Sequence, residues 1–296
     1  MDLADLLTEQ PRPELADLDL RATLDLVRLM ADDQAHAIET VAAAIPSIAR
    51  AIDAVLPRLE GGGRLIYVGA GTAGRLGLLD AAECPPTFNS DRVIGVMAGG
   101  ADAFLTSSEA VEDDAGAGAR DLDALGVSEA DAVVGVAASG RTPYTIGAVK
   151  HARTRGAVTV GICCNPDSVL RRHVDHAIEL VVGPEVIAGS TRLKAGTAQK
   201  IVLNMISTIT MVKLGKTFGN LMVDLRATNE KLQDRARRIV IQATGAPAES
   251  VDGAVAAADG EAKVAILMLL LGTDAAAARD RLTAHHGRVR PALEAR

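Results

Sequence analysis

The chain has 296 residues, of which 48% are apolar, so it can bury the core of one large α/β domain or of a domain with a smaller appendage. Lysine and arginine total 31 against 38 aspartate and glutamate, a net charge of −7. This balance argues against a general nucleic-acid binder, which needs a basic surface. The three cysteines lack framework spacing, which argues against a disulfide scaffold, and Cys163 and Cys164 are expected to be buried small apolar residues.

No segment of the chain predicts a membrane or metal partner. The first ten residues lack the basic start and the apolar stretch of a signal peptide. The apolar run 262–272 is too short to span a bilayer. CxxC and HExxH patterns are absent from the sequence, so we expect a cytoplasmic protein without a metal site.

The apolar pattern along the chain predicts an α/β fold. Residues 20–60 carry a helical stripe that includes Leu24, Val27 and Met30, and Pro46 is expected to interrupt it. Helical stretches such as 143–155 lie between most of the apolar runs that follow, so we expect a mainly parallel sheet with helices on both faces. The runs predicted as buried strands are 64–70, 92–98, 131–138, 157–164 and 177–182.

The last third of the chain is predicted to be helical. Residues 197–219 form a long helix in this prediction, 221–242 a strand-like start and a charged helix, and 248–296 a set of short helices. We divide the chain into an N-terminal helical region (1–55), a central sheet domain (56–245) and a C-terminal helical subdomain (246–296).

The first chemistry-bearing stretch is the glycine loop Gly69-Ala-Gly-Thr-Ala-Gly74, which follows a predicted strand and precedes a helix. It fits the GxGxxG dinucleotide fingerprint. That fingerprint also needs an acidic residue at the end of the next strand, where this chain has Met97-Ala-Gly-Gly100. We therefore expect Gly71 and Thr72 to hold a phosphate at the helix N-terminus, with a turn required only for packing as the alternative.

The second stretch repeats this arrangement after the strand predicted over 131–138. Its loop contains Ser139, Gly140, Arg141 and Thr142, and Pro143 suits the first turn of a helix. Two hydroxyl-bearing loops at the carboxyl ends of strands in one sheet indicate a sugar-phosphate site. The alternative is that both loops only cap helices.

The third stretch, 183–200, places Ser190, Thr191, Arg192 and Lys194 before the long helix. These polar groups suit an anion or sugar hydroxyls, and we include Ser190, Thr191 and Lys194 in the candidate site. Glu185 is either a ligand contact or a cap and ion-pair partner, and the sequence leaves both open.

Four longer strings carry a resemblance to a known family. They are "GGGRLIYVGAGTAGRLGLLDAAECPPTF", "VGVAASGRTPY", "GPEVIAGSTRLKAGTAQK" and "GNLMVDLRATNEKL". They closely resemble the N-acetylmuramic acid 6-phosphate etherases, which are built on a sugar isomerase (SIS) domain, and the similarity extends from residue 7 to the C-terminal helices. The resemblance implies a SIS-type sheet of about five parallel strands flanked by helices, with N-terminal helices and a small C-terminal helical subdomain.

The resemblance also implies an activity. The family cleaves the D-lactyl ether of N-acetylmuramic acid 6-phosphate with water, giving N-acetylglucosamine 6-phosphate and D-lactate, as a carbon–oxygen lyase. It implies a cytoplasmic homodimer without metal or organic cofactor, which recycles cell-wall amino sugars. The alternatives are a non-catalytic SIS sugar-phosphate sensor, similar to the glucokinase regulators, and an aldose–ketose sugar-phosphate isomerase.

Two glutamates are catalytic in the family. One maps onto Glu83 of the "ECPP" string, and the other onto the acidic string 109–114, where the pattern favours Glu112 over Glu109. Once the sugar ring opens, the C1 aldehyde acidifies the C2 proton and the ether oxygen lies β to the carbonyl, so a base and an acid suffice. We assign Glu112 as the base at C2 and Glu83 as the acid to the lactate oxygen and then the base for water; the reverse assignment stays open.

Two features depart from a simple version of this site. Ala73 stands where the family usually has serine, which predicts a phosphate affinity weaker by about 1 kcal/mol, and Cys163 replaces another usual serine. Glu83 follows Gly74 by 9 residues, about 13 Å along a helix, which is long for a phosphorylated hexose. Either Pro85 and Pro86 bend the chain back, or the site is shared across a dimer interface, and we favour the shared site.

Overall fold

The structure is a computed structural model that describes residues 5–100, 102–105, 111–224 and 230–295. It divides into two compact units, one formed by Met1–Ala82 with Arg92–Ser207 and one formed by Glu83–Asp91 with Thr208–Arg296. These limits differ from the predicted divisions at 55 and 245, so the three-part domain organisation stays a prediction.

The first unit is built on a five-stranded sheet, and all five predicted strands are confirmed. Neighbouring strands pair in parallel throughout, in the order β2-β1-β3-β4-β5. Valine and isoleucine fill most of these strands, which suits strands that are covered on both faces. The strands are β1 (Leu65–Gly69), β2 (Val93–Met97), β3 (Ala132–Val136), β4 (Val158–Cys163) and β5 (His176–Glu179).

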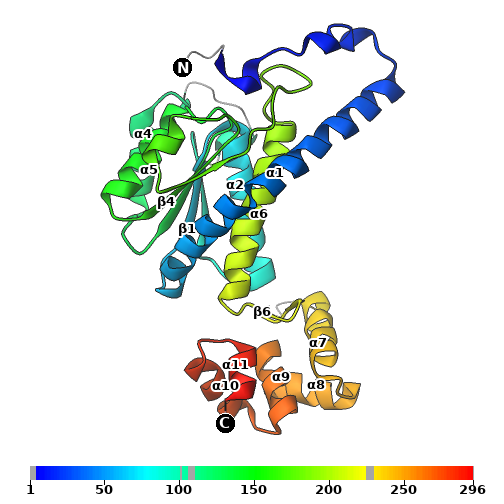
Figure 1. The fold of residues 1–296 in the computed structure, drawn as a ribbon. Coiled ribbons are helices and arrows are strands. Elements are labelled where there is room, and N and C mark those ends of the chain that lie inside the picture. The colour runs from blue at the N-terminus through cyan, green and yellow to red at the C-terminus, as the bar shows by residue number, and fades with distance from the viewer. Residues whose placement is uncertain (1–4, 101, 106–110, 225–229, 296) are drawn as a thin grey trace. The chain divides into compact units, whose positions relative to one another are not determined.

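Helices cover both faces of this sheet (Figure 1). Ile66 and Val133 face α4 (Ala115–Ala124) and α5 (Pro143–Thr154), in one apolar cluster with Tyr144. Tyr67 points to the opposite face, where its hydroxyl donates to the Leu203 carbonyl of α6 (Lys194–Lys213) at 3.2 Å. The α1 helix (Thr23–Glu60) and α2 (Gly71–Phe88) complete that second layer.

The α1 helix runs through Pro46, so the expected interruption there is wrong. Ala44 and Ile48 are buried on either side of the proline, and their packing holds the helix together despite the missing N–H. Length and composition alone would allow α1 to cross a membrane, a test that core helices also pass. Its buried residues recur on one face, and it carries the buried carboxylate Asp33, as expected of a helix packed on a core.

The second unit contains a small apolar core among helices. Residues 217–222 form the hairpin of β6 (Thr217–Phe218) and β7 (Leu221–Met222), and β7 matches the strand-like start predicted from residue 221. The long helix predicted over 197–219 ends at Lys213, so its last six residues were predicted wrongly. Leu267, Val240 and Ala278 are buried together with other apolar side chains of the unit. The helices are α7 (Glu230–Thr244), α8 (Ala248–Ala257), α9 (Ala262–Leu271), α10 (Ala275–Ala284) and α11 (Val289–Glu294).

Charged side chains tie β1 to β3 at the amino edge of the sheet. The Asp131 carboxylate accepts hydrogen bonds from the Arg64 guanidinium at 3.0 and 2.8 Å, from the Arg64 amide at 3.0 Å and from the Ser128 amide at 3.0 Å. Its side chain is 3% exposed. Burial raises the pKa of Asp131, but the hydrogen bonds from Arg64 and Ser128 outweigh it, so the pKa lies below its ordinary value.

At the carboxyl edge of the sheet, the chain has a switch point between β1 and β3, where the direction of strand addition reverses. The chain leaves β1 toward β2 and later returns to β3 on the opposite side of β1, where Gly69 and Val136 are register partners. Ligands of open α/β sheets bind at this kind of switch point, outside the carboxyl ends of the strands. The loops that follow β1 and β3 are therefore the first place to look for a site.

Candidate active site at the carboxyl edge of the sheet

The first loop turns directly from β1 into α2. Gly71 begins the helix with a φ of +52°, a conformation that favours glycine. Thr72 is half-buried in the first helical turn, and Ala73 is 7% exposed. The first turn of α2 thus presents backbone N–H groups at the switch point, as a phosphate site requires.

The Glu112 carboxylate lies against this loop. A Cβ atom built on Gly71 would lie 2.9 Å from Oε1 of Glu112, so only glycine leaves that oxygen its present position. The Glu112 carbonyl oxygen accepts a hydrogen bond from the Tyr144 amide at 3.0 Å, which fixes its backbone to the start of α5. Glu112 therefore connects the two predicted phosphate loops, while its competitor Glu109 lies outside the described residues.

The second loop is held in a tight turn. The Ser139 hydroxyl accepts a hydrogen bond from the Arg141 amide at 3.3 Å, and Gly140 has a φ of +66°. Thr142 is the N-cap of α5 by its backbone, but its side chain makes no capping hydrogen bond in the described chain. Ser139 and Arg141 line a cavity of about 140 Å³ with Leu6, Ser168 and Val169.

The third loop lies beside the first. A Cβ atom built on Gly196, in the first turn of α6, would lie 3.5 Å from Cγ2 of Thr72. Ser190 and Thr191 are half-buried in the turn that precedes this helix, and Gly196 donates to the Thr191 carbonyl at 2.9 Å. The predicted binding residues of all three loops thus come together at one edge of one unit.

Glu185 caps the α6 helix. Its carboxylate accepts from the Lys194 amide at 3.2 Å and from the Ala195 amide at 2.9 Å, and the residue is fully buried. Burial raises the pKa of Glu185, while these two N–H donors and the Lys194 charge act in the opposite direction. The sequence left open whether Glu185 contacts a ligand or acts as a cap, and in the structure it caps α6.

Lys194 is engaged elsewhere in this structure. Its ammonium lies 3.0 Å from Oδ1 of Asp33, and the lysine side chain is 5% exposed. Its predicted role toward substrate stays a prediction, and any anion that it bound would compete with Asp33.

Glu83 is exposed on α2 and belongs to the second unit. The helix continues through Pro85 and Pro86 to Phe88, so the idea that the prolines bend the chain back is wrong. The Thr87 hydroxyl donates to the Glu83 carbonyl at 2.8 Å within this turn. Glu83 follows Gly71 by 12 residues of unbroken helix, which corresponds to about 18 Å.

The cysteines and the other cavities add no chemistry to this site. All three cysteines are buried, as expected for Cys163 and Cys164, and burial raises the pKa of Cys163 to about 11. Within the described ranges, no group of three His, Cys, Asp or Glu side chains is placed to hold a metal ion. A larger cavity of about 760 Å³ in the second unit includes Lys263 and Arg279, which are paired with acids.

Several polar residues near the site were not identified from the sequence. Thr8, Asp33, Asn165 and Ser168 are each at most 4% exposed, and each is hydrogen-bonded. The partners of Thr8, Asp33 and Asn165 lie far away along the chain, so no local motif marks these three residues, whereas Ser168 bonds to nearby Cys163. The one available signal was the start of the family resemblance at residue 7, next to Thr8.

Two family models match the part of the chain that contains the five-stranded sheet. Residues 47–153 match the glucokinase regulatory protein N-terminal SIS domain, and residues 108–209 match the SIS domain. A solved structure described as a phosphosugar isomerase involved in capsule formation from Bacteroides fragilis superposes with a TM-score of 0.50. It is 17% identical and covers 65% of this chain and 91% of its own, so it supports the fold alone.

Curated relatives match nearly the whole chain. An N-acetylmuramic acid 6-phosphate etherase of Rubrobacter xylanophilus is 62% identical over 98% of this chain and 97% of its own. Proteins of the same name from Streptomyces avermitilis and Salmonella agona are 59% and 53% identical, over 99% of this chain and over 95% and 100% of their own lengths. Together with the SIS-type sheet and the loops at its carboxyl edge, these matches show that the chain belongs to the N-acetylmuramic acid 6-phosphate etherase family.

Proposed function

We propose that this protein cleaves the D-lactyl ether of N-acetylmuramic acid 6-phosphate with water, giving N-acetylglucosamine 6-phosphate and D-lactate, as a carbon–oxygen lyase of the cytoplasm. The observation that carries the proposal is the Glu112 carboxylate beside Gly71, between two phosphate-type loops, in a chain 53–62% identical to named etherases. A sensor needs no carboxylate there, and an isomerase needs no leaving-group acid.

The charges of the two loops favour one orientation of the substrate. The Glu112 carboxylate stands against the first loop and disfavours a phosphate beside it. The second loop offers Arg141, the hydroxyls of Ser139 and Thr142 and the N-terminus of α5, all of which attract an anion. We infer that the phosphate binds mainly at the second loop and that the sugar chain extends toward Gly71, Thr72 and Glu112.

Elimination followed by addition then accounts for the products. In the open-chain sugar, Glu112 removes the C2 proton and the C3–O bond breaks, with Glu83 donating a proton to the departing lactate oxygen. Water adds to C3 of the unsaturated aldehyde as Glu83 takes its proton, and C2 regains a proton from Glu112. One water is consumed for each ether cleaved, and the reverse assignment of the two glutamates gives the same products.

We infer a homodimer in which the two glutamates of one site come from different chains. The proposal is supported by the unbroken α2 helix, along which about 18 Å separate Glu83 from Gly71. A phosphorylated hexose bound at the two loops would not extend along that length of helix. A partner chain that presents its own Glu83 would complete the pair.

A coupled assay for D-lactate tests the activity. The purified protein is expected to release one lactate for each N-acetylmuramic acid 6-phosphate consumed, with N-acetylglucosamine 6-phosphate as the second product. Binding of the sugar phosphate without product would indicate a sensor. Formation of a ketose phosphate without lactate would indicate an isomerase, and either result would overturn the proposal.

A further inference from the structure

The N-terminal segment 6–12, here called the N-terminal strap, is built into the first unit. Leu6 is 2% exposed and Thr8 is fully buried. A short 3-10 helix, η2 (Leu7–Glu9), holds the segment in a defined conformation. A segment with so little regular structure is ordered in this way only where specific contacts tie it down.

Thr8 ties the strap to two loops at once. The Asn165 side chain donates to the Thr8 hydroxyl at 3.0 Å and to the Ala138 carbonyl at 3.1 Å, and its Oδ1 accepts from the Thr8 amide at 3.4 Å. On the other side, the Gly189 amide donates to the Thr8 carbonyl at 3.0 Å. Ala138 directly precedes Ser139, and Gly189 directly precedes Ser190, so Thr8 lies between the second and third loops of the candidate site.

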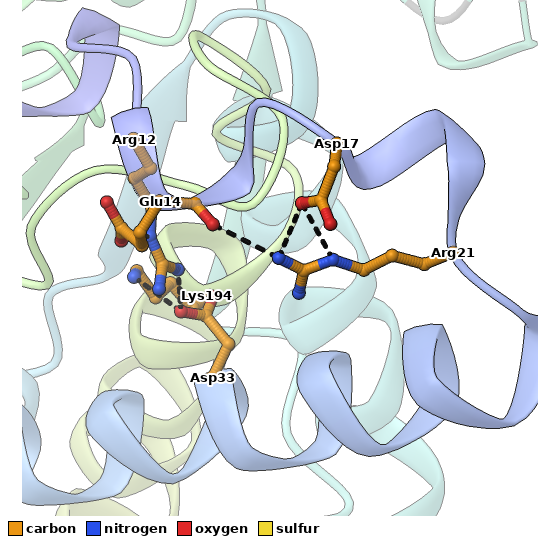
Figure 2. A network of polar contacts seen from close by, with 6 residues as sticks. All are labelled: Arg12, Glu14, Asp17, Arg21, Asp33 and Lys194. Atoms are coloured by element: carbon orange, nitrogen blue, oxygen red, sulfur yellow. Dashed lines mark hydrogen bonds and ion pairs between the residues drawn. The ribbon is translucent and has the colours of Figure 1, made fainter.

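Arg12 makes a second attachment (Figure 2). Its guanidinium lies 2.6 Å from Oδ1 of Asp33, the same oxygen that the Lys194 ammonium approaches at 3.0 Å. The Asp33 side chain is 3% exposed and that of Arg12 is 22% exposed, so the carboxylate end of this ion pair is shielded from water. Arg12 and Lys194 thus share one buried carboxylate oxygen, and the end of the strap is bound to the start of α6.

Leu6 brings the strap to the substrate side of the second loop. Its side chain lines the 140 Å³ cavity together with Ser139 and Arg141. The strap therefore contacts the second and third loops of the candidate site.

We propose that the N-terminal strap is a positioning element of the active site, with Thr8 and Arg12 as its positioning residues. Thr8 acts through Asn165 on the second loop, and Arg12 acts through Asp33 on Lys194. The inference rests on the proposed function only in that the loops it orders are those assigned to the sugar phosphate. A ligand-free measurement can therefore test it separately.

Hydrogen exchange of the wild-type protein and of Thr8→Val, without ligand, measures the order of the loops. Valine keeps the shape of threonine but removes the hydroxyl that Asn165 binds. Amides of 137–142 and 187–193 are expected to exchange at least about fivefold faster in Thr8→Val. Thr8→Ser, which keeps the hydroxyl, is expected to behave like the wild type. The same is expected of Thr154→Val, which removes a hydroxyl that donates to the His151 carbonyl within α5.

A matched pair of arginine variants tests the second attachment. Arg12→Gln removes a partner of the buried Asp33, whereas Arg21→Gln removes a partner of Asp17, whose side chain is 60% exposed (Figure 2). Binding of N-acetylglucosamine 6-phosphate by calorimetry is expected to weaken about tenfold in Arg12→Gln and by less than about twofold in Arg21→Gln. In the lactate assay KM is expected to rise by the same factors, with kcat within about threefold of the wild type.

Two results would overturn the positioning role. The first is loop exchange in Thr8→Val within about twofold of the wild type, or equal acceleration in Thr8→Ser. The second is a sugar-phosphate affinity of Arg12→Gln equal to that of Arg21→Gln. If the wild type neither binds the sugar phosphate nor releases lactate, the proposed function fails, and the exchange experiment still decides on the strap.

Discussion

The two edges of the same parallel sheet use polar residues in opposite ways. At the amino edge, the Asp131 carboxylate accepts four hydrogen bonds from Arg64 and Ser128, so its oxygens are satisfied by groups of the protein itself. At the carboxyl edge, the Thr142 side chain leaves α5 without a side-chain cap, and Ser139 and Arg141 border a cavity. The same two strands, β1 and β3, connect the two edges, so the difference in how the polar residues are used comes from the loops at the strand ends.

The amino edge contributes mainly to stability, and the carboxyl edge contributes mainly to ligand binding. Groups that satisfy one another, as at the amino edge, stabilise the fold and offer nothing to a ligand. Groups that border a cavity, as Ser139 and Arg141 do at the carboxyl edge, lie where a ligand can contact them. Substitutions at the amino edge should therefore change unfolding and spare turnover, and those at the carboxyl edge should do the reverse.

The largest effect is expected from the two glutamates. Glu112→Gln and Glu83→Gln remove a proton-transfer group and should each lower kcat for lactate release by about 10²- to 10⁴-fold, with sugar-phosphate binding retained. Mixing the two variants after unfolding and refolding should restore about a quarter of the wild-type activity if each site takes one glutamate from each chain. The absence of any recovery would contradict the shared site.

Substitution of Asp131 at the amino edge should change the free energy of unfolding and not the turnover. Asp131→Asn is expected to lower the free energy of unfolding at pH 7 by about 2 to 3 kcal/mol, because Arg64 and Ser128 lose a buried charged acceptor. Asp17→Asn removes an exposed ion pair and should lower the free energy of unfolding much less than Asp131→Asn does. Denaturant unfolding measures both, and kcat of each folded variant should equal that of the wild type.

The same variant carries a pH dependence. Because the pKa of Asp131 is lower in the folded protein than its ordinary value of 3.8, the unfolded chain binds this proton more tightly. The stabilisation is therefore fully present above about pH 4 to 5 and is lost as pH falls through the lowered value. The difference between wild type and Asp131→Asn should shrink in that range, and a constant difference down to pH 3 would argue against this account.

A smaller loss is expected at Arg141. Removing this guanidinium from the second loop in Arg141→Ala should raise KM by about 10- to 100-fold, and Arg141→Lys should recover only part of it. Arg153→Ala provides the control, because Arg153 is exposed near the other end of α5 and pairs with Asp175. Equal KM values in Arg141→Ala and Arg153→Ala would place the phosphate elsewhere.

The smallest effect should come from Ala73. Ala73→Ser adds a hydroxyl in the first turn of α2 and is expected to lower KM about fivefold, which corresponds to one neutral hydrogen bond. Steady-state kinetics on the two proteins measures the change. An unchanged or higher KM would mean that the hydroxyl does not reach the substrate.

The sequence was sufficient to predict what depends on local pattern. The five strands follow from runs of valine and isoleucine, and the first two loops follow from glycine and hydroxyl residues directly after those runs. Pro46 misled because the cost of a proline is local, whereas the packing of Ala44 and Ile48 that keeps α1 continuous is not. Local chemistry therefore determined where the sheet and its loops lie.

What the sequence could not predict are the contacts across the chain. Thr8 and Asn165 are 157 residues apart, and Asp33 and Lys194 are 161 residues apart. Both pairs are buried polar contacts that only the folded chain brings together. Glu185 illustrates the same limit, since its role as the cap of α6 required knowing that the loop returns its carboxylate to the Lys194 and Ala195 amides.

The most direct test of the central claim is exchange of the C2 proton of N-acetylglucosamine 6-phosphate with solvent in deuterium oxide, followed by NMR. The account predicts that the wild-type protein incorporates deuterium at C2 and that Glu112→Gln loses this exchange while still binding the sugar phosphate. Exchange at the wild-type rate in Glu112→Gln would contradict the claim that the carboxylate beside Gly71 moves this proton.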